Sequence, residues 1–481
     1  MAIRLEKYLL WIGLILFALL NTYFIATEKY YPMAIPLGLV MVWAVLYRLK
    51  ELMLFVALLT PFSLNLENLK QLGGVGFYFP TEPILAGVLL VFIVWSFGKE
   101  RLDKELWRHP VSVVVIIGLI WLFITSMTSS LPLISFKFLA SRLWFVIPLF
   151  FLMIAFFKDQ NYLKKYFWMY IISLALVIIY TMMKHAANGF DEQTGHYVMD
   201  PFYKDHTSYG AVIAMFIPLV LGHIFSIKLE TWKKGLAILL GVILTVGLIF
   251  SYTRAAWLSL VGALGVFIVM RLRIKFWLVF SVMFAMIAGY IVFQDDIMRE
   301  LERNRQDSSE NFTEHIQSMT NVSTDASNLE RLNRWSSAMR MFEQRPFFGW
   351  GPGTYMFQYS PFQKHSETTI ISTNLGDAGN AHSEYLGPLC ETGVLGLVFF
   401  LCFVIMILKT GIELYYKLED PYLKMLCMCM LLGLITYFIH GVLNNFLDTD
   451  KVSVPFWGFS AGIVALDIYQ RNRALKTAKS S

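Results

Sequence analysis

The sequence has little charge. Only 15% of its 481 residues are Asp, Glu, Lys or Arg, whereas 57% are hydrophobic, and soluble domains carry roughly 25% charged residues. This composition excludes an ordinary soluble protein. Cysteine is scarce as well, and its four residues all lie in apolar segments: Cys390, Cys402, Cys427 and Cys429. Neither a disulfide framework nor a zinc site is indicated, and we expect these cysteines to be packing residues.

Motifs for metals, cofactors and nucleic acids are missing too. The chain contains no HExxH, no CxxC and no acidic cluster with metal-ligand spacing, so we expect no metal and no cofactor. The net charge of +6 comes from basic residues near the ends of apolar segments, and it indicates no nucleic-acid partner. The turn Gly349-Trp-Gly-Pro-Gly353 lacks the Lys-Ser/Thr of a phosphate-binding loop, so we do not expect it to bind a nucleotide.

Long hydrophobic runs, in contrast, recur along nearly the whole chain. A run of about 18 or more apolar residues can span a bilayer, so the sequence predicts an all-α, polytopic membrane helical bundle with about 12–14 transmembrane helices. We expect spans at 8–25, 33–47, 52–62, 82–97, 111–128, 138–157, 166–183, 207–227, 236–251, 255–270, 276–293, 383–408, 422–443 and 453–469. The third is short and contains Pro61, which indicates a broken or re-entrant segment. The first follows Arg4 and Lys7 without a convincing cleavage site, so we expect a retained anchor.

The basic residues of the loops predict the orientation. Most of them lie in the terminal segments and in one set of alternate loops, which holds Arg48, Lys158, Arg271 and Lys417. Because Lys and Arg are enriched in cytoplasmic loops, we expect both termini in the cytoplasm and the one long hydrophilic insertion on the outer face. The chain then divides into an N-terminal transmembrane bundle (1–293), a large, partly helical outer loop (294–381), C-terminal transmembrane helices (382–470) and a basic cytoplasmic tail (471–481).

The most informative stretch is the one where the outer loop returns to the membrane. His382 and Ser383 stand at the expected start of a span, where unpaired N–H groups and the helix dipole favour an anion. A titratable imidazole at this position suits chemistry on a phosphorylated substrate. The alternative is that the two residues only cap the helix, and the spacing leaves both interpretations open.

The outer loop also contains a predicted amphipathic helix near residues 329–345. Its apolar residues recur at helical spacing, and they are Leu329, Leu332, Trp335, Met339 and Phe342. Arg331, Arg334 and Arg345 lie beside this stripe, and Pro346 ends the helix. We expect the apolar face to contact lipid and the arginines to face the site. Packing of the helix on its neighbours is the alternative.

Arg254 lies in a tight outer hairpin between two spans, on the face where positive charge is scarce. A guanidinium group suits bidentate phosphate binding, and charges at membrane depth are functional by default. An Arg at a helix boundary can also snorkel to the headgroups. Together with Arg331, Arg334 and His382, Arg254 predicts an electropositive pocket for a diphosphate.

Further polar residues are candidates for lining the same cavity, namely Asp205, His206, Asn380, Ser383 and Glu391. Asp205 and His206 open another span on the outer face, much as His382 opens its own. An acidic residue next to a histidine is also a common helix cap, and both interpretations of this pair stand.

These residues together resemble the O-antigen ligase superfamily, which includes O-antigen ligases, O-antigen polymerases and bacterial protein O-oligosaccharyltransferases. The ligase pattern His-[Asn/Ser/Gln]-x9-Gly-x-x-[Gly/Thr/Tyr] is matched by His382, Ser383, Gly393 and Gly396. Tyr-Thr-Arg-Ala-Ala-Trp around Arg254 and Arg-Leu-Asn-Arg-Trp from Arg331 are similar to the segments that carry the family's outer-face arginines. The resemblance covers about residues 205–445 by motif and the whole chain by topology.

The resemblance implies metal-independent glycan transfer at the periplasmic face of the bacterial inner membrane. Arg254 and Arg331 would hold an undecaprenyl diphosphate-linked glycan donor, and His382 would be the catalytic base. The family pattern fixes only one arginine before the tryptophan, so it leaves Arg334 open. The complete histidine motif implies lipid A–core as the acceptor, as in a ligase. A growing glycan or a protein is the alternative, as in polymerases and O-oligosaccharyltransferases.

A flippase or transporter is the alternative from another class of membrane protein. Transporters usually bury ionisable groups near the middle of the membrane. The predicted span interiors hold few such groups, among them His223, Glu391 and His440, and the large outer loop suits an enzyme. The sequence therefore favours a glycan-transferring enzyme over a transporter.

Overall fold

The computed structural model describes residues 2–27, 35–66, 78–96, 103–226, 230–275, 281, 326–368, 372 and 379–480. This part of the chain is helical apart from one small sheet, in which β1 (Leu64–Asn65) pairs antiparallel with β2 (Tyr78–Phe79). Nine of the described helices are long and apolar enough to cross a membrane, and three shorter apolar helices accompany them. The predicted all-α multi-pass membrane protein is confirmed. The span expected at 276–293 lies outside the described residues.

The long helices follow most of the predicted spans closely. They are α6 (Pro110–Met127), α7 (Pro132–Val146), α9 (Gln160–Ala187), α11 (His206–Ile224), α12 (Thr231–Ile249), α13 (Arg254–Arg271), α18 (Leu386–Lys417), α19 (Pro421–His440) and α20 (Asp450–Ser480). The remaining helices are α1 (Ala2–Ala26), α2 (Ile35–Tyr47), α3 (Leu49–Leu59), α4 (Thr81–Ser96), α5 (Lys104–Arg108), α8 (Met153–Phe156), α10 (Glu192–Gly195), α16 (Ala326–Gln344) and α17 (Tyr355–Gln358). Single 3₁₀ turns lie at Thr60–Phe62, Ser360–Phe362 and His365–Glu367, and a π-helical segment, Ile147–Leu152, joins α7 to α8.

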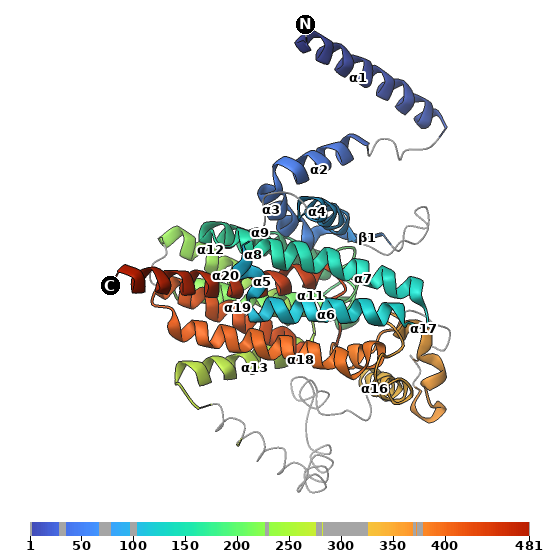
Figure 1. Ribbon diagram of the computed structural model, residues 1–481. Helices are drawn as coiled ribbons and strands as arrows, with labels where there is room; N and C mark the ends of the chain where they lie inside the picture. Colours follow the sequence, from blue (N-terminus) through green and yellow to red (C-terminus); the bar gives the residue numbers. More distant parts are fainter. Residues whose placement is uncertain are drawn as a thin grey trace.

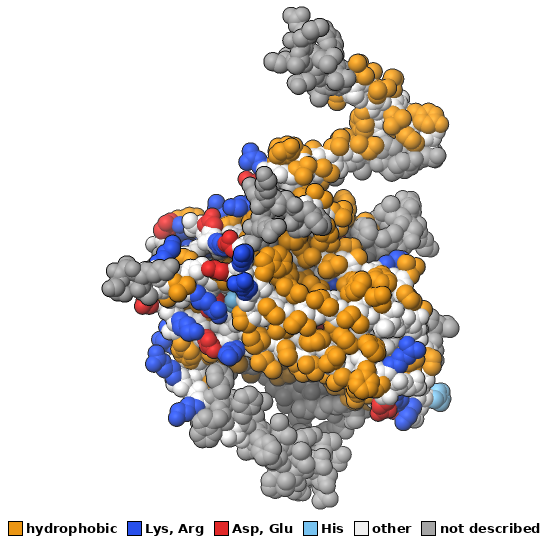
Figure 2. Space-filling view, viewed as in Figure 1, with side chains coloured by type: hydrophobic (Ala, Val, Ile, Leu, Met, Phe, Trp, Pro, Cys, Tyr) orange, Lys and Arg blue, Asp and Glu red, His pale blue; other side chains and the backbone are white. Residues whose placement is uncertain are grey.

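The bundle is built around α19 and α20. Helices α11, α13 and α18 pack on α19, and α20 packs on α18 and α19, so both central helices are buried along most of their length. Figure 1 shows α6, α7 and α18 along one side of the bundle, while α1 and α2 extend away from it. The side over α6, α7 and α18 is a broad apolar surface (Figure 2), as expected for helices that face lipid.

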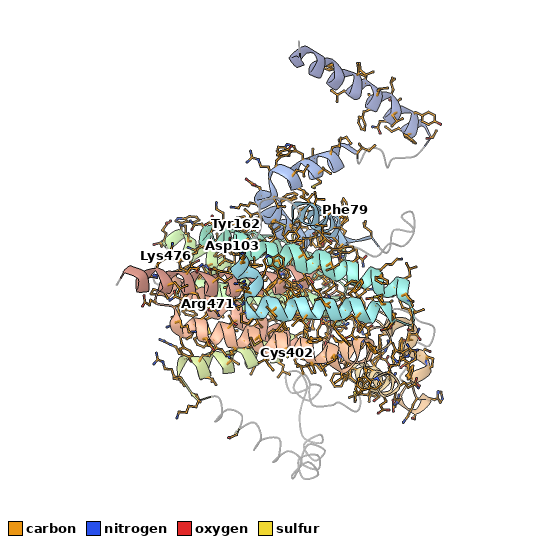
Figure 3. The ribbon with its side chains drawn as sticks, in the orientation of Figure 1. Phe79, Asp103, Tyr162, Cys402, Arg471 and Lys476 are labelled. Atoms are coloured by element: carbon orange, nitrogen blue, oxygen red, sulfur yellow. The ribbon has the colours of Figure 1, made fainter. Side chains whose placement is uncertain are left out.

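Charged side chains gather at one end of this bundle. Figure 2 shows Lys, Arg, Asp and Glu there, and Figure 3 labels Arg471 and Lys476 at the same end, where the chain terminates. Gln470 Nε2 donates to the Lys417 carbonyl (3.3 Å), and Asn472 Nδ2 donates to Glu105 Oε2 (2.8 Å). The basic alternate loops predicted from the sequence therefore meet at the same end of the bundle, which we call the C-terminal end. His382 lies at the opposite end of the bundle, which we call the His382 end.

Helix α3 corresponds to the short third span. Eleven residues rise only about 16 Å at 1.5 Å per residue, about half of a hydrocarbon core, so α3 does not cross. Pro61 ends it in a single tight turn. The buried Lys451 ammonium group of α20 donates to the Thr60 carbonyl (2.6 Å), the Ser63 carbonyl (2.8 Å) and Ser63 Oγ (2.7 Å). These bonds hold the broken end of α3 inside the bundle.

The predicted span 138–157 is wrong at its start, because α7 begins at Pro132 and continues through α8 to Phe156. Lys137 and Arg142 interrupt the apolar run, and the predicted span therefore starts only after Lys137. Both belong to α7. Arg142 donates to the Leu447 carbonyl (3.0 Å), and both residues line a cavity inside the protein. Because these charged residues interrupt the apolar run, the prediction left residues 132–137 out of the helix.

Helix α18 is broken at Gly393. That residue has φ of 73° and ψ of −174°, so the first turns of α18 are separated from the rest of the helix. The Val394 N–H group donates to the Pro346 carbonyl (2.8 Å) rather than to its own helix. The break frees carbonyl groups of the preceding turn, and buried carbonyl groups need donors.

The Gly-rich loop, residues 346–355, supplies most of those donors. Trp350 N donates to the Cys390 carbonyl (3.1 Å) and Gly351 N to the Glu391 carbonyl (2.8 Å). The Glu391 carboxylate in turn accepts bonds from the N–H groups of Gly353 (3.0 Å) and Tyr355 (2.9 Å). The turn that resembled a nucleotide loop therefore docks the outer loop onto α18.

We predict that Gly393→Ala destabilises the protein. A Cβ atom there would lie 2.1 Å from the Phe347 carbonyl oxygen, at a φ that side chains rarely adopt, and such backbone strain costs about 1–3 kcal/mol. Gly265→Ala is the matched control, because a Cβ on this α13 residue meets nothing within 4 Å. Thermal unfolding in one detergent should show a lower apparent Tm for Gly393→Ala only. Equal Tm values for the two variants would contradict the role given to the break.

Candidate functional site

His382 lies in a short loop before α18, the His382 loop, residues 379–385. The Asn380 Oδ1 atom accepts a bond from the His382 N–H group (3.0 Å), and His382 has a φ of 48°, a left-handed conformation that few residues other than glycine adopt. Trp335 Nε1 of α16 donates to the His382 carbonyl at 3.4 Å. The backbone of the loop is thus fixed by its own Asn side chain and by the outer helix.

The predicted start of this span at Ser383 is three residues too early, because α18 begins at Leu386. Ser383 Oγ accepts bonds from the N–H groups of Tyr385 and Leu386, both at 3.3 Å, so Ser383 does act as a cap. The His382 imidazole does not cap the helix. The sequence left open whether His382 and Ser383 only cap the helix. In the structure, the capping interpretation applies to Ser383 and not to His382.

The imidazole of His382 is held in its neutral form. Burial is the largest cause, and the charges of Arg331 and Arg334 add to it, so that the pKa of His382 is lowered to about 4. The negative charges of Glu330 and Asp205 oppose this shift. A histidine with such a pKa is unprotonated at neutral pH and is able to accept a proton.

Arg334 is buried and engaged with protein groups. Its Nε donates to Glu330 Oε1 (2.6 Å), and its guanidinium carbon lies 4.2 Å from the centre of the Tyr359 ring. A Cβ atom on Gly379 would overlap the same guanidinium group. Arg334 thus connects α16 with the start of the His382 loop, a position that suits holding the loop rather than meeting a ligand.

The two faces of α16 follow the prediction only in part, because Phe342 of the apolar stripe packs on the protein and Arg345 is exposed. Leu332 and Met339 of the apolar stripe are exposed, whereas Arg334 and Asn333 are buried toward the bundle. Arg331 is half-buried. Its charge acts on three imidazole rings, those of His206, His382 and His440.

The structure brings several predicted residues around Arg331. The charge of Asp205 acts on the same three imidazole rings, so Asp205, His206, Arg331, His382 and His440 form one group, the Arg331 cluster. Asp205 is also the N-cap of α11, because Asp205 Oδ1 accepts a bond from the Ser208 N–H group (2.7 Å). The cap and the cavity interpretations of Asp205 are therefore compatible.

The Arg254 hairpin packs against the Arg331 cluster. His206 Nδ1 donates to the Ser251 carbonyl (2.8 Å), and Thr253 Oγ1 donates to the His206 carbonyl (2.7 Å). Arg254 follows as the first residue of α13 and is half-buried. The imidazole of His440, at the end of α19, lies beside the backbone of Ala255. Residues from four separate segments thus meet near His382.

His440 is the member of this group that sequence reasoning missed as a site residue. Asn444 Nδ2 lies 3.2 Å from His440 Nε2 and is positioned to donate to it. The available signal was the polar run His-Gly-Val-Leu-Asn-Asn at an outer helix end. A single histidine near the end of a predicted span forms no motif with its neighbours, so the sequence does not distinguish it from an ordinary helix-end residue.

A cavity of about 910 Å³ lies on the other side of the His382 loop. Helices α6, α7, α18 and α20 form its walls, and the His382 loop and the segment 441–449 border its end. Three predicted residues line it, namely Asn380, Ser383 and Glu391. The other candidates do not, and they are Asp205, His206, Arg254, Arg331, Arg334 and His382. The residues predicted to share one cavity are thus divided between this cavity and the Arg331 cluster with its neighbours.

Glu384 joins the two loops at this end. Its Oε1 atom accepts bonds from the N–H groups of Phe446 (2.7 Å) and Leu447 (2.9 Å) and from the Tyr437 hydroxyl (2.5 Å). The Glu384 N–H group donates to the Gly441 carbonyl (2.8 Å). The segment 441–449 is therefore fixed relative to His382.

We predict that His382 stays unprotonated well below the ordinary range of histidine. Because its pKa in the folded protein is lowered to about 4, the neutral form persists as the pH falls through 6.5 and is lost only near 4. Diethyl pyrocarbonate modifies neutral imidazoles, and mass spectrometry of the His382 peptide should give a half-maximal rate near pH 4. A midpoint near 6.5 would mean that burial and the neighbouring arginines do not act on this ring.

The comparison with protein families agrees with the position of these residues. Residues 236–401 match the O-antigen ligase family (Wzy_C), a range that contains Arg254, Arg331, His382 and Gly393. A comparison with curated proteins gave no match. Members of the matched family are enzymes that transfer lipid-linked glycans. The resemblance inferred from the motifs is confirmed for residues 236–401, which match the O-antigen ligase family within a multi-pass membrane protein.

Proposed function

We propose that the protein is an O-antigen ligase, which transfers a glycan from undecaprenyl diphosphate to lipid A–core at the periplasmic face of the bacterial inner membrane. The observation that carries this proposal is the neutral His382 imidazole beside Arg331, at the end of the bundle opposite the basic loops. A neutral imidazole that accepts a proton and a guanidinium group near it suit this reaction. The family match supports the transfer of a lipid-linked glycan.

The residues divide the chemistry between them. The acceptor hydroxyl oxygen attacks the anomeric carbon of the donor, and the bond between that carbon and the diphosphate oxygen breaks. His382 accepts the hydroxyl proton, and undecaprenyl diphosphate leaves with the bonding electron pair. Arg254 and Arg331 stabilise the charge that develops on the diphosphate, because guanidinium groups bind phosphate oxygens in a bidentate manner.

The charge distribution supports a periplasmic site. Basic alternate loops meet at the C-terminal end of the bundle, and such loops favour the cytoplasm. His382 and the described part of the outer loop then face the periplasm, with both termini in the cytoplasm. The exposed Leu332 and Met339 of α16 suit contact with the outer leaflet.

We predict that Arg254→Ala and Arg331→Ala each weaken binding of an undecaprenyl diphosphate-linked oligosaccharide by about 10- to 100-fold. Charge-assisted hydrogen bonds contribute roughly 1.5–3 kcal/mol, and lysine should rescue poorly because it lacks the planar fork. Equilibrium binding to purified protein measures the effect. His382→Ala should instead keep donor affinity and lose about 10²–10⁴-fold in turnover.

Arg271→Ala is the matched control for the arginine variants. It removes an exposed guanidinium group from the other end of α13, far along the helix from Arg254. Donor affinity equal to that of the wild type in both site variants would remove Arg254 and Arg331 from the diphosphate site. Normal turnover of His382→Ala would refute its role as the base.

The lipopolysaccharide profile of a deletion strain separates the ligase from the polymerase. We predict unsubstituted lipid A–core on a gel, with long polymer accumulating on undecaprenyl diphosphate, because a ligase acts after polymerisation. The complete histidine motif favours this outcome. Core that carries a single repeat unit would show instead that the protein is a polymerase. A normal profile with loss of protein glycosylation would indicate an O-oligosaccharyltransferase.

A further inference from the structure

The cavity beside the His382 loop has two chemically different parts. Apolar side chains of α6 and α18 line its walls, including Val115, Phe399 and Phe403. Polar residues of the segment 441–449, Asn445 and Asp448, line its His382 end. An amphiphilic ligand is suited to a cavity of this kind.

Buried polar atoms on this cavity lack hydrogen-bond partners among the described residues. They are Asn445 Oδ1, Trp144 Nε1 and Trp457 Nε1, and all three residues line the cavity. Buried polar groups in proteins are almost always paired. These residues add an amide and two indole groups to the cavity lining, and a ligand that both donates and accepts hydrogen bonds suits such a lining.

Asp448 is the charged residue that faces this space. Its side chain is exposed and lines the cavity. Its carboxylate accepts a bond from its own N–H group, which leaves further lone pairs on the two oxygens. The other two carboxylates at this end, those of Glu384 and Glu391, already accept bonds from backbone N–H groups.

The cavity lining is rich in carboxyl groups. They belong to Glu82, Glu384, Glu391 and Asp448, whereas the lining cations are Lys137 and Arg142. No group of three metal-ligating side chains occurs among the described residues. Hydroxyl groups satisfy a carboxylate, an amide carbonyl and indole N–H groups together, since each hydroxyl both donates and accepts.

We propose that Asn445 and Asp448 bind the hydroxyl groups of a substrate sugar at this end of the cavity. The sugar belongs either to the acceptor or to the donor, and the apolar walls accommodate an adjoining lipid segment. The inference depends on the proposed function in one respect, namely that the sugar belongs to the glycan donor or to the acceptor. Because Glu384 fixes the segment 441–449 to the His382 loop, a sugar held there is positioned relative to His382.

The first test measures binding without turnover. In protein that carries His382→Ala, radiolabelled undecaprenyl diphosphate-linked oligosaccharide and radiolabelled lipid A–core are titrated separately. Asp448→Asn and Asn445→Ala should each weaken one of the two ligands by about tenfold, as loss of one hydrogen bond to a charged group predicts. The ligand that is weakened identifies the source of the sugar.

Glu343→Gln is the matched control, because Glu343 is an exposed acid on α16, away from the cavity. It should leave both affinities unchanged. Asp448→Glu, which keeps the charge, should recover part of the lost affinity. Unchanged affinities in both cavity variants would overturn the proposal, as would a parallel loss of both ligands together with a lower apparent Tm.

A second test is independent of the family function. Asn445→Cys, in a background without the four native cysteines, is labelled with a maleimide in a sugar-free detergent. Dodecyl maltoside should slow labelling at least tenfold more than an equal concentration of a sugar-free detergent of the same chain length. Equal protection by both would overturn sugar binding. If dodecyl maltoside protects while neither labelled substrate binds, the proposed function fails and the sugar site stands.

Discussion

The carbonyl groups that α18 leaves unpaired at Gly393 are the constraint on which the site depends. They need donors, and the Gly-rich loop provides them from Trp350 and Gly351. Docking of that loop fixes the end of α16, and α16 in turn carries Arg331 toward the His382 ring and bonds the His382 carbonyl through Trp335. The motif thus links two structural features of α18 and the loop before it. His382 lies in the loop that holds the imidazole, and Gly393 makes the break that positions α16 beside that loop.

Much of the architecture could be predicted, because membrane helices follow from local composition. Apolar runs and helix-end charges gave an all-α bundle whose helices mostly begin and end close to the predicted residues. The errors at the starts of α7 and α20 have one physical cause. Lys137 and Arg142 lie within α7, and Lys451 lies within α20, because the bundle offers them internal partners or a polar cavity. Composition alone does not reveal those long-range partners.

The candidate site was predictable in its residues but not in its arrangement. Arg254, Arg331 and His382 stand out because charge is scarce near spans, whereas Arg334, three residues from Arg331, has the same sequence signal and a different environment. His440 lies at the end of α19 and Asp448 shortly after it, without distinctive spacing, so the tertiary structure is needed to place them beside the His382 loop. The division of the predicted residues between the cavity and the Arg331 cluster is likewise a property of the tertiary structure.

The His382 loop is therefore best understood as a partition. On one side lies the guanidinium group of Arg331, with Arg254 in the adjacent hairpin, and on the other the cavity is lined by carboxyl, amide and indole groups. Guanidinium groups suit a diphosphate, whereas the cavity lining suits sugar hydroxyl groups. If the two substrates of a glycan transfer approach a single base, the different chemistry of its two sides keeps each in its own place. The neutral state of His382 then leaves the ring free to accept the proton that passes between them.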